Sequence, residues 1–177
     1  MTTALLIIDV QQALCSGEYE CFEIKRVIDN INDLSAGARD AGVPVILIQH
    51  EEAGSPLAHN AQGWQLAEGL DTSAKDLRVR KTTPDSFYQT NLQHLVPKED
   101  FERLIICGLQ TDYCVNATVR QALKLGYDVV LAGDAHSTVA NASMTAEDII
   151  AEHNKDLAHL TGSVARIDVT RTSDIRF

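Results

Sequence analysis

Leu104-Ile105-Ile106-Cys107-Gly108-Leu109-Gln110-Thr111-Asp112-Tyr113-Cys114-Val115 is the stretch of sequence that decides the fold. Its short apolar run, ended by Gly108, predicts a buried parallel strand, and the residues that follow predict a turn and the start of a helix. We expect Thr111 or Asp112 to cap that helix with a side-chain oxygen. Cys114 would then lie in the first helical turn, where free N–H groups and the helix dipole stabilise an anion. Its thiol is therefore expected to have a depressed pKa and to act as a nucleophile, although a small buried cysteine without a function fits the same position.

Apolar runs on either side of this stretch alternate with helical patterns. Strands are expected over 4–8, 43–48, 76–80, 104–107, 128–132 and 164–167, and helices over 22–41, shortly after Pro84-Asp85, up to Lys124 and from Thr145. Between Gln49 and Leu70 the pattern fails, which is typical of a lid or a binding loop, or of a loop without a function. About six alternations predict one α/β domain over residues 1–177, a three-layer fold whose mainly parallel, six-stranded sheet has helices on both faces.

Composition narrows the range of partners and compartments. Lys and Arg number 15 against 25 Asp and Glu, a formal net charge of −10, which disfavours nucleic acid and anionic lipid. No apolar run approaches the roughly 20 residues that span a bilayer, and the N-terminus lacks a basic leader, so we expect a cytoplasmic protein that acts on a small molecule. The cysteines are Cys15, Cys21, Cys107 and Cys114, which show no metal-type spacing and are expected to be free thiols.

Three residues far apart in sequence are predicted to meet at one edge of the sheet. Asp9 ends the first strand, Lys81 ends the third, and Cys114 begins the helix after the fourth. Right-handed crossovers bring the carboxyl ends of parallel strands to one edge, where such sheets bind ligands. A carboxylate there can take a thiol proton, and an ammonium favours both anions. The plainer alternatives are a turn acid at Asp9 and a solvated Lys81.

The residues around these three positions resemble the signatures of a known family. Asp9-Val10-Gln11, Arg80-Lys81 and the stretch from Gly108 to Val115 are similar to three motifs of the isochorismatase-like cysteine hydrolases, which include nicotinamidases and carbamoyl-amide hydrolases. The resemblance runs from about Ala4 to the helix that contains His153. It implies the strand order 3-2-1-4-5-6 and, with the apolar faces of the later helices, a homodimer or larger homo-oligomer.

The resemblance also implies roles for individual residues. Asp9, Lys81 and Cys114 would form a catalytic triad, with Asp9 as the base and Lys81 as its electrostatic partner. A cis peptide between Leu109 and Gln110 would turn the Gln110 N–H toward the substrate. Together with the Cys114 N–H, it would form an oxyanion hole.

Departures from the family's members limit the choice of reaction. Nicotinamidases hold a metal with an Asp-x-His pair and a later His, whereas this chain has Gln49-His50-Glu51-Glu52. His50, Glu51 and His59 could form a metal set, but we expect no metal and no cofactor. Isochorismatases proper cleave a vinyl ether without a cysteine nucleophile, so Cys114 favours hydrolysis of a C–N amide or carbamoyl bond through a thioester.

Side chains from loops at the same edge are expected to bind the substrate. Aromatic groups with polar tips suit a small planar ligand, although Trp64 and Phe87 fit a core-covering role equally well. The expected substrate-binding residues are Gln12, His50, Trp64, Phe87, Tyr88 and Tyr113. His136 is expected to be structural.

The alternatives to a cysteine-dependent amide hydrolase are a nicotinamidase-type metal-assisted amidase, a redox protein that pairs Cys107 with Cys114, a nucleotide-binding module, and a non-catalytic binding relative. The sequence has no glycine-rich phosphate loop that would support the nucleotide-binding module.

Overall fold

A six-stranded, all-parallel sheet in the order β3-β2-β1-β4-β5-β6 forms the centre of the molecule, as expected. The computed structural model describes residues 2–160 and 165–177. The strands are β1 (Thr3–Ile8), β2 (Val45–His50), β3 (Leu77–Lys81), β4 (Arg103–Leu109), β5 (Asp128–Ser137) and β6 (Ile167–Thr170). The last strand therefore begins where the predicted one ended, and Val164 lies outside the described residues.

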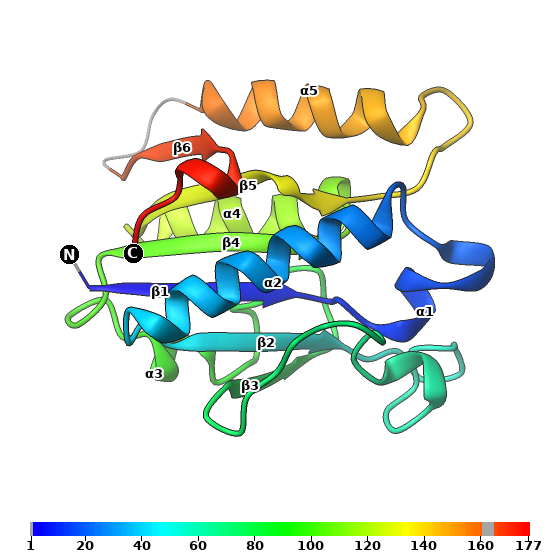
Figure 1. The fold of residues 1–177 in the computed structure, drawn as a ribbon, viewed down its shortest axis with the longest axis horizontal. Helices are drawn as coiled ribbons and strands as arrows, with labels where there is room; N and C mark the ends of the chain where they lie inside the picture. The colour runs from blue at the N-terminus through cyan, green and yellow to red at the C-terminus, as the bar shows by residue number, and fades with distance from the viewer. Residues whose placement is uncertain (1, 161–164) are drawn as a thin grey trace.

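Helices cover both faces of this sheet (Figure 1). The α-helices are α1 (Gln12–Cys15), α2 (Ile24–Asp40), α3 (Leu92–Leu95), α4 (Asn116–Lys124) and α5 (Ala146–Ala158). The short helical turns are η1 (Gly17–Tyr19), η2 (Gln62–Trp64), η3 (Thr111–Val115) and η4 (Thr172–Asp174). None of the described helices is long and apolar enough to cross a membrane.

The core is divided by the sheet into two layers, because successive side chains of a strand point to opposite faces. Leu5 and Ile7 of β1 pack toward α2, whereas Leu6 and Ile8 pack toward the face that α4 covers. All six residues of β1 are buried, and the five that follow Thr3 are apolar, as expected for a strand covered on both faces. β2 runs on through Gln49 and His50, two residues beyond the predicted strand, and from Glu51 to Leu70 the only helical turn is η2, so the expected loop character is confirmed for that segment.

The carboxyl ends of β1 and β4 meet where the strand order reverses. Ile8 pairs with Gly108, so the residues that follow each strand begin side by side. A Cβ on Gly108 would lie 2.1 Å from the Ile8 carbonyl oxygen, and Gly108 has φ of +115°. Glycine is therefore required for the close approach of the two strands beside the predicted site.

Candidate active site

Asp9, Lys81 and Cys114 converge at this edge of the sheet. Lys81 Nζ lies 2.7 Å from Asp9 Oδ2 and 3.1 Å from Cys114 Sγ, and it also donates to the Thr83 carbonyl at 3.1 Å. Lys81 comes from β3, two strands away from β1, and its long side chain crosses the end of β2, where its partner in the strand register is His50. The three side chains that the sequence predicts to meet are therefore in contact.

Asp9 occupies a tight turn immediately after β1. Its φ is +52°, which is uncommon for a residue other than glycine, and the Gln11 N–H donates to the Asp9 carbonyl at 2.8 Å. Asp9 Oδ2 is held by Lys81, whereas the buried Oδ1 has no hydrogen-bond partner. One carboxylate oxygen is thus left to accept a proton inside the site.

The helix after β4 differs from the prediction at its start. Residues 111–115 form a π-helical turn, η3, before α4 begins, and no side chain caps it. The predicted capping by Thr111 or Asp112 is wrong, because both side chains are used elsewhere. Thr111 bonds to a residue of β5, and Asp112 bonds to the residue that follows β5. Thr111 Oγ1 lies 2.8 Å from His136 Nδ1, and Asp112 Oδ1 accepts from Thr138 Oγ1 at 2.6 Å.

The expected depressed pKa of Cys114 is also wrong. Burial and the negative charge of Asp9 raise the pKa of this thiol to about 12, although the Lys81 ammonium acts in the opposite direction. Removal from water penalises the thiolate more than the nearby cation favours it. The sulfur is therefore a neutral thiol beside the Asp9 carboxylate.

The segment between β4 and η3 has the backbone geometry that the resemblance implies. The peptide bond between Leu109 and Gln110 is cis. The Gln110 carbonyl accepts from the N–H groups of Tyr113 and Val115 at 3.2 and 3.1 Å, which fixes the turn. The Gln110 side chain points to Cys21, with Nε2 3.8 Å from Sγ.

Among the predicted substrate-binding residues, His50 lies against Lys81 and close to Asp9 and Cys114. Its Nδ1 is 3.4 Å from Lys81 Nζ, and a ring nitrogen, an Asp9 oxygen and Cys114 Sγ all lie within 4.8 Å of one another. Burial and the positive charge of Lys81 lower the pKa of His50, so the ring is neutral at physiological pH. It can offer a hydrogen bond without adding charge.

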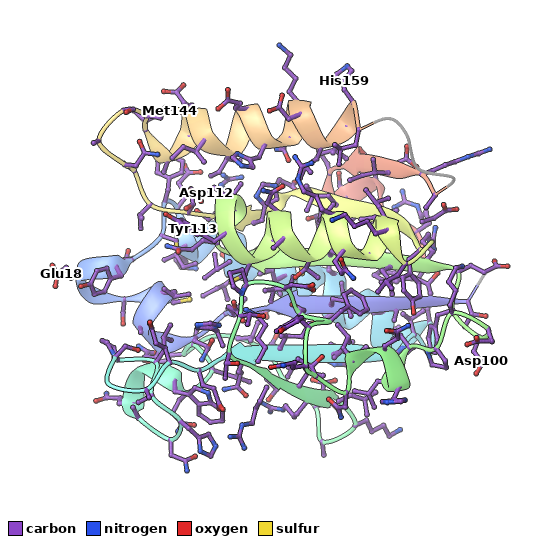
Figure 2. All side chains as sticks on the ribbon, turned by 180° about the vertical axis from the view of Figure 1, so that it is seen from behind. Glu18, Asp100, Asp112, Tyr113, Met144 and His159 are labelled. Carbon is purple, nitrogen blue, oxygen red and sulfur yellow. The ribbon has the colours of Figure 1, made fainter. Side chains whose placement is uncertain are left out.

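The other predicted lining residues are more dispersed. Tyr88 and Tyr113 are exposed, and Figure 2 shows Tyr113 beside Asp112 at the end of the molecule opposite Asp100. Phe87 is buried and stacks on Tyr127 in the core, which is the core-covering alternative. Trp64 packs edge-on against His59.

Gln12 and its neighbour Gln11 have different roles. Gln12 bonds to Ser16 and to the N–H of Glu68, so its side chain supports the loop. Gln11 is fully buried, and its carboxamide contacts the backbone of His50 and Trp64. Gln11 belongs to the first quoted motif, but nothing in the sequence indicates which backbone groups its side chain reaches.

The metal set considered from sequence is not assembled. Arg80 engages the Glu51 carboxylate through two nitrogens, and His59 packs on Trp64. Among the described residues, the one group of His, Cys and acidic side chains with metal-like spacing is Asp9, His50 and Cys114. The Lys81 ammonium contacts all three, and its positive charge opposes a cation there.

All four cysteines are free thiols, as expected. Cys107 packs in the layer toward α2, whereas Cys114 packs against the layer on the other face of the sheet. The placement of these two residues does not favour the redox pairing considered from sequence.

Most of this chain is similar to known proteins. An isochorismatase domain model matches residues 3–166. A streptothricin hydrolase from Streptomyces noursei is 40% identical over 136 residues, which cover 76% of this chain and 49% of that protein. A ureidoacrylate amidohydrolase from Pseudomonas syringae is 29% identical over 170 residues, covering 75% of this chain and 69% of that protein. A crystal structure described as an isochorismatase family protein has a TM-score of 0.85 and 35% identity, covering 94% of this chain and 98% of that chain. The chain spans about half the length of the streptothricin hydrolases that it matches.

Proposed function

This chain belongs to the isochorismatase family, and we propose that within it the protein is a cysteine-dependent amidohydrolase of small molecules. The observation that carries the proposal is the position of Lys81 Nζ, in contact with both Asp9 Oδ2 and Cys114 Sγ. The relatives named streptothricin hydrolase and ureidoacrylate amidohydrolase support an amide-type bond as the target.

In the proposed first half-reaction, Asp9 Oδ1 takes the thiol proton as Cys114 Sγ attacks the amide carbonyl carbon. The raised pKa of Cys114 makes a free thiolate scarce at neutral pH, so proton removal has to accompany the attack. Lys81, 3.1 Å from the sulfur, stabilises the negative charge as it develops. The oxyanion would bind the N–H groups of Gln110 and Cys114.

Collapse of that tetrahedral intermediate breaks the C–N bond. Asp9 returns its proton to the leaving nitrogen, ammonia or an amine departs, and the acyl group remains on Cys114 as a thioester. In the second half-reaction Asp9 deprotonates a water molecule that attacks the thioester carbon. The carboxylic acid leaves, and the thiol recovers its proton.

A substrate panel tests this proposal. Small primary amides, ureido compounds that include ureidoacrylate, and streptothricin would be incubated with the protein, with ammonia release and product mass as readouts. We expect hydrolysis of at least one amide, an acyl adduct on Cys114 in rapidly quenched samples, and no turnover by a folded Cys114→Ala variant. Cys15→Ala is the matched control, because Cys15 is also a thiol whose pKa is raised to about 12 by burial.

Two outcomes would overturn the assignment. Turnover by Cys114→Ala at the wild-type rate excludes Cys114 as the nucleophile. Loss of activity in EDTA, restored by a divalent cation, would favour the metal-assisted alternative.

Homo-oligomerisation is a separate part of the proposal. Light scattering that gives the mass of one chain would contradict it.

A further inference from the structure

Gln11 ties three segments together around the proposed active site. Its Nε2 donates to the His50 carbonyl and to the Trp64 carbonyl, both at 2.9 Å, and its Oε1 accepts from the His50 N–H at 2.8 Å. The side chain is fully buried and has both amide hydrogens and its oxygen in use. Both backbone groups of His50 are thus held by one carboxamide.

The same residue is part of the turn that presents the proposed base. The Gln11 N–H closes the turn at the Asp9 carbonyl, and Gln11 forms a β-bridge with Leu66. Gln49 adds a second amide bond to the Trp64 carbonyl at 2.9 Å, and that bond does not involve His50. Of these two buried amides, Gln11 is therefore the one that holds His50.

Because the Gln11 carboxamide fixes the His50 backbone, it also fixes the position of the imidazole ring. The charged and titratable groups around the ring are Lys81 from β3, Asp9 after β1, Cys114 in η3, and Glu51 and Glu52 after β2. Lys81 has only three protons, and Asp9, Thr83 and Cys114 are its nearer partners. The His50 ring, which also hydrogen-bonds to the Thr83 backbone, is the more distant partner of Lys81 at 3.4 Å, and this contact can be exchanged for a hydrogen bond with a substrate atom.

We propose that Gln11 is a positioning residue, which clamps the His50 backbone so that the imidazole lies against Lys81 and contacts the polar end of the substrate next to the scissile bond. The proposal rests on the proposed amidase function for the substrate contact. The clamp itself can be tested without any substrate.

The test compares Gln11→Met, which keeps the length of the side chain but loses all three contacts, with Gln49→Met, which loses only a contact to Trp64. The titration of the His50 ring is followed by NMR. In the wild type the pKa of His50 lies below its ordinary value of 6.5. We expect the pKa of His50 to rise toward 6.5 in Gln11→Met, because the ring would leave its partly buried position beside Lys81. In Gln49→Met the pKa of His50 should stay unchanged.

Kinetics with a substrate found in the panel separates positioning from general support of the fold. We expect kcat/KM to fall about 10- to 100-fold in Gln11→Met and by less than about threefold in Gln49→Met. His50→Ala should cause a loss similar to that of Gln11→Met, and the double variant should lose no more than either single variant. If Gln11→Met does not fold, Gln11→Asn, one methylene shorter, should show the same changes.

Two results would overturn the proposal: an unchanged His50 titration in a folded Gln11 variant, or losses in kcat/KM that multiply in the double variant. Failure of every amide in the panel would count against the amidase function. The His50 titration would then still decide whether the clamp exists.

Discussion

Lys81 and Asp9 form an ion pair almost entirely out of contact with water. Their charged atoms are 2.7 Å apart, and the side chains are 0% and 1% exposed. Burial alone would lower the pKa of Lys81, but the negative charge of Asp9 and the hydrogen bonds to Asp9 and Cys114 outweigh it and raise that pKa. Each charge is therefore tolerated in this position because the other is present.

Replacing Lys81 by Met should strand the Asp9 carboxylate in the interior. We expect the free energy of unfolding to fall by about 3–5 kcal/mol and amidase activity to be lost. Urea unfolding at neutral pH and substrate turnover measure the two effects. The double variant Asp9→Asn/Lys81→Met removes both charges, so it should recover most of the stability and none of the activity. A single variant as stable as wild type would contradict the interdependence of the pair.

The convergence of these residues could be predicted because it follows from topology. In a parallel sheet, Asp9, Lys81 and the segment leading to Cys114 must emerge at the same edge once the strands are identified. The strands near the centre can be identified from sequence because they are buried on both faces and read as apolar runs, as in β1 and β4. The predicted strand bounds are less accurate where the apolar pattern is weaker. The last strand, β6, is short and partly exposed, and it begins later in the chain than predicted.

Properties that depend on three-dimensional surroundings could not be predicted in this way. The helix dipole predicts a depressed pKa for Cys114, but η3 is a π-helical turn and burial outweighs any such effect. The roles of Gln11 and Thr83 depend on which carbonyl group faces which donor, and a residue's identity does not specify this. Phe87 follows β3 as the sequence predicts, but only packing decides that its ring faces Tyr127.

Buried thiols should make the protein less stable in alkali. Burial raises the pKa of Cys15, Cys21 and Cys114 from 9.0 to about 12. Between pH 9 and about 12 the unfolded chain therefore releases thiol protons that the folded chain keeps, so the free energy of unfolding falls as the pH rises through this range. The raised pKa of Lys81 acts in the same direction.

Urea unfolding between pH 7 and 10.5 tests this expectation. The wild type should lose stability progressively above about pH 9. Cys15→Ser removes one of the shifted thiols and should flatten the decline without affecting the proposed nucleophile. Equal stability of the wild type at pH 7 and pH 10.5 would contradict the prediction.

Gly108 should be irreplaceable for steric reasons. An alanine Cβ there would lie 2.1 Å from the carbonyl oxygen and 2.6 Å from the nitrogen of Ile8, so β1 and β4 would have to separate beside the site. We expect Gly108→Ala to lose more than about 4 kcal/mol or to fail to fold. Gly42→Ala is the matched control, because Gly42 also has a positive φ, +71°, but a Cβ added there would meet no atom within 4 Å. That control should lose only about 1–2 kcal/mol, and similar losses in the two variants would refute the steric argument.

His136 should make the protein sensitive to acid. It is buried between η3 and α5, with Nδ1 2.8 Å from Thr111 Oγ1 and Nε2 2.8 Å from Asn154 Oδ1. Asn154 Nδ2 donates to the Gly133 carbonyl, which orients Oδ1 as an acceptor and so places the His136 proton on Nε2. Burial lowers the pKa of His136 to about 4. Between pH 6.5 and 4 the unfolded chain therefore binds a proton that the folded chain excludes, and stability falls as the pH falls, by up to about 1.4 kcal/mol per pH unit from this group.

Urea unfolding between pH 7 and 4 measures that loss and assigns it to His136. His136→Gln should lower stability at pH 7, because a buried pair of hydrogen bonds is altered, but its unfolding free energy should depend less steeply on pH than that of the wild type. His159→Gln, at an exposed histidine of the same chain, should keep the wild-type slope. Identical pH slopes in the wild type and His136→Gln would show that protonation of other groups governs the acid limit, and His136 would then have no part in holding η3 over the sheet edge.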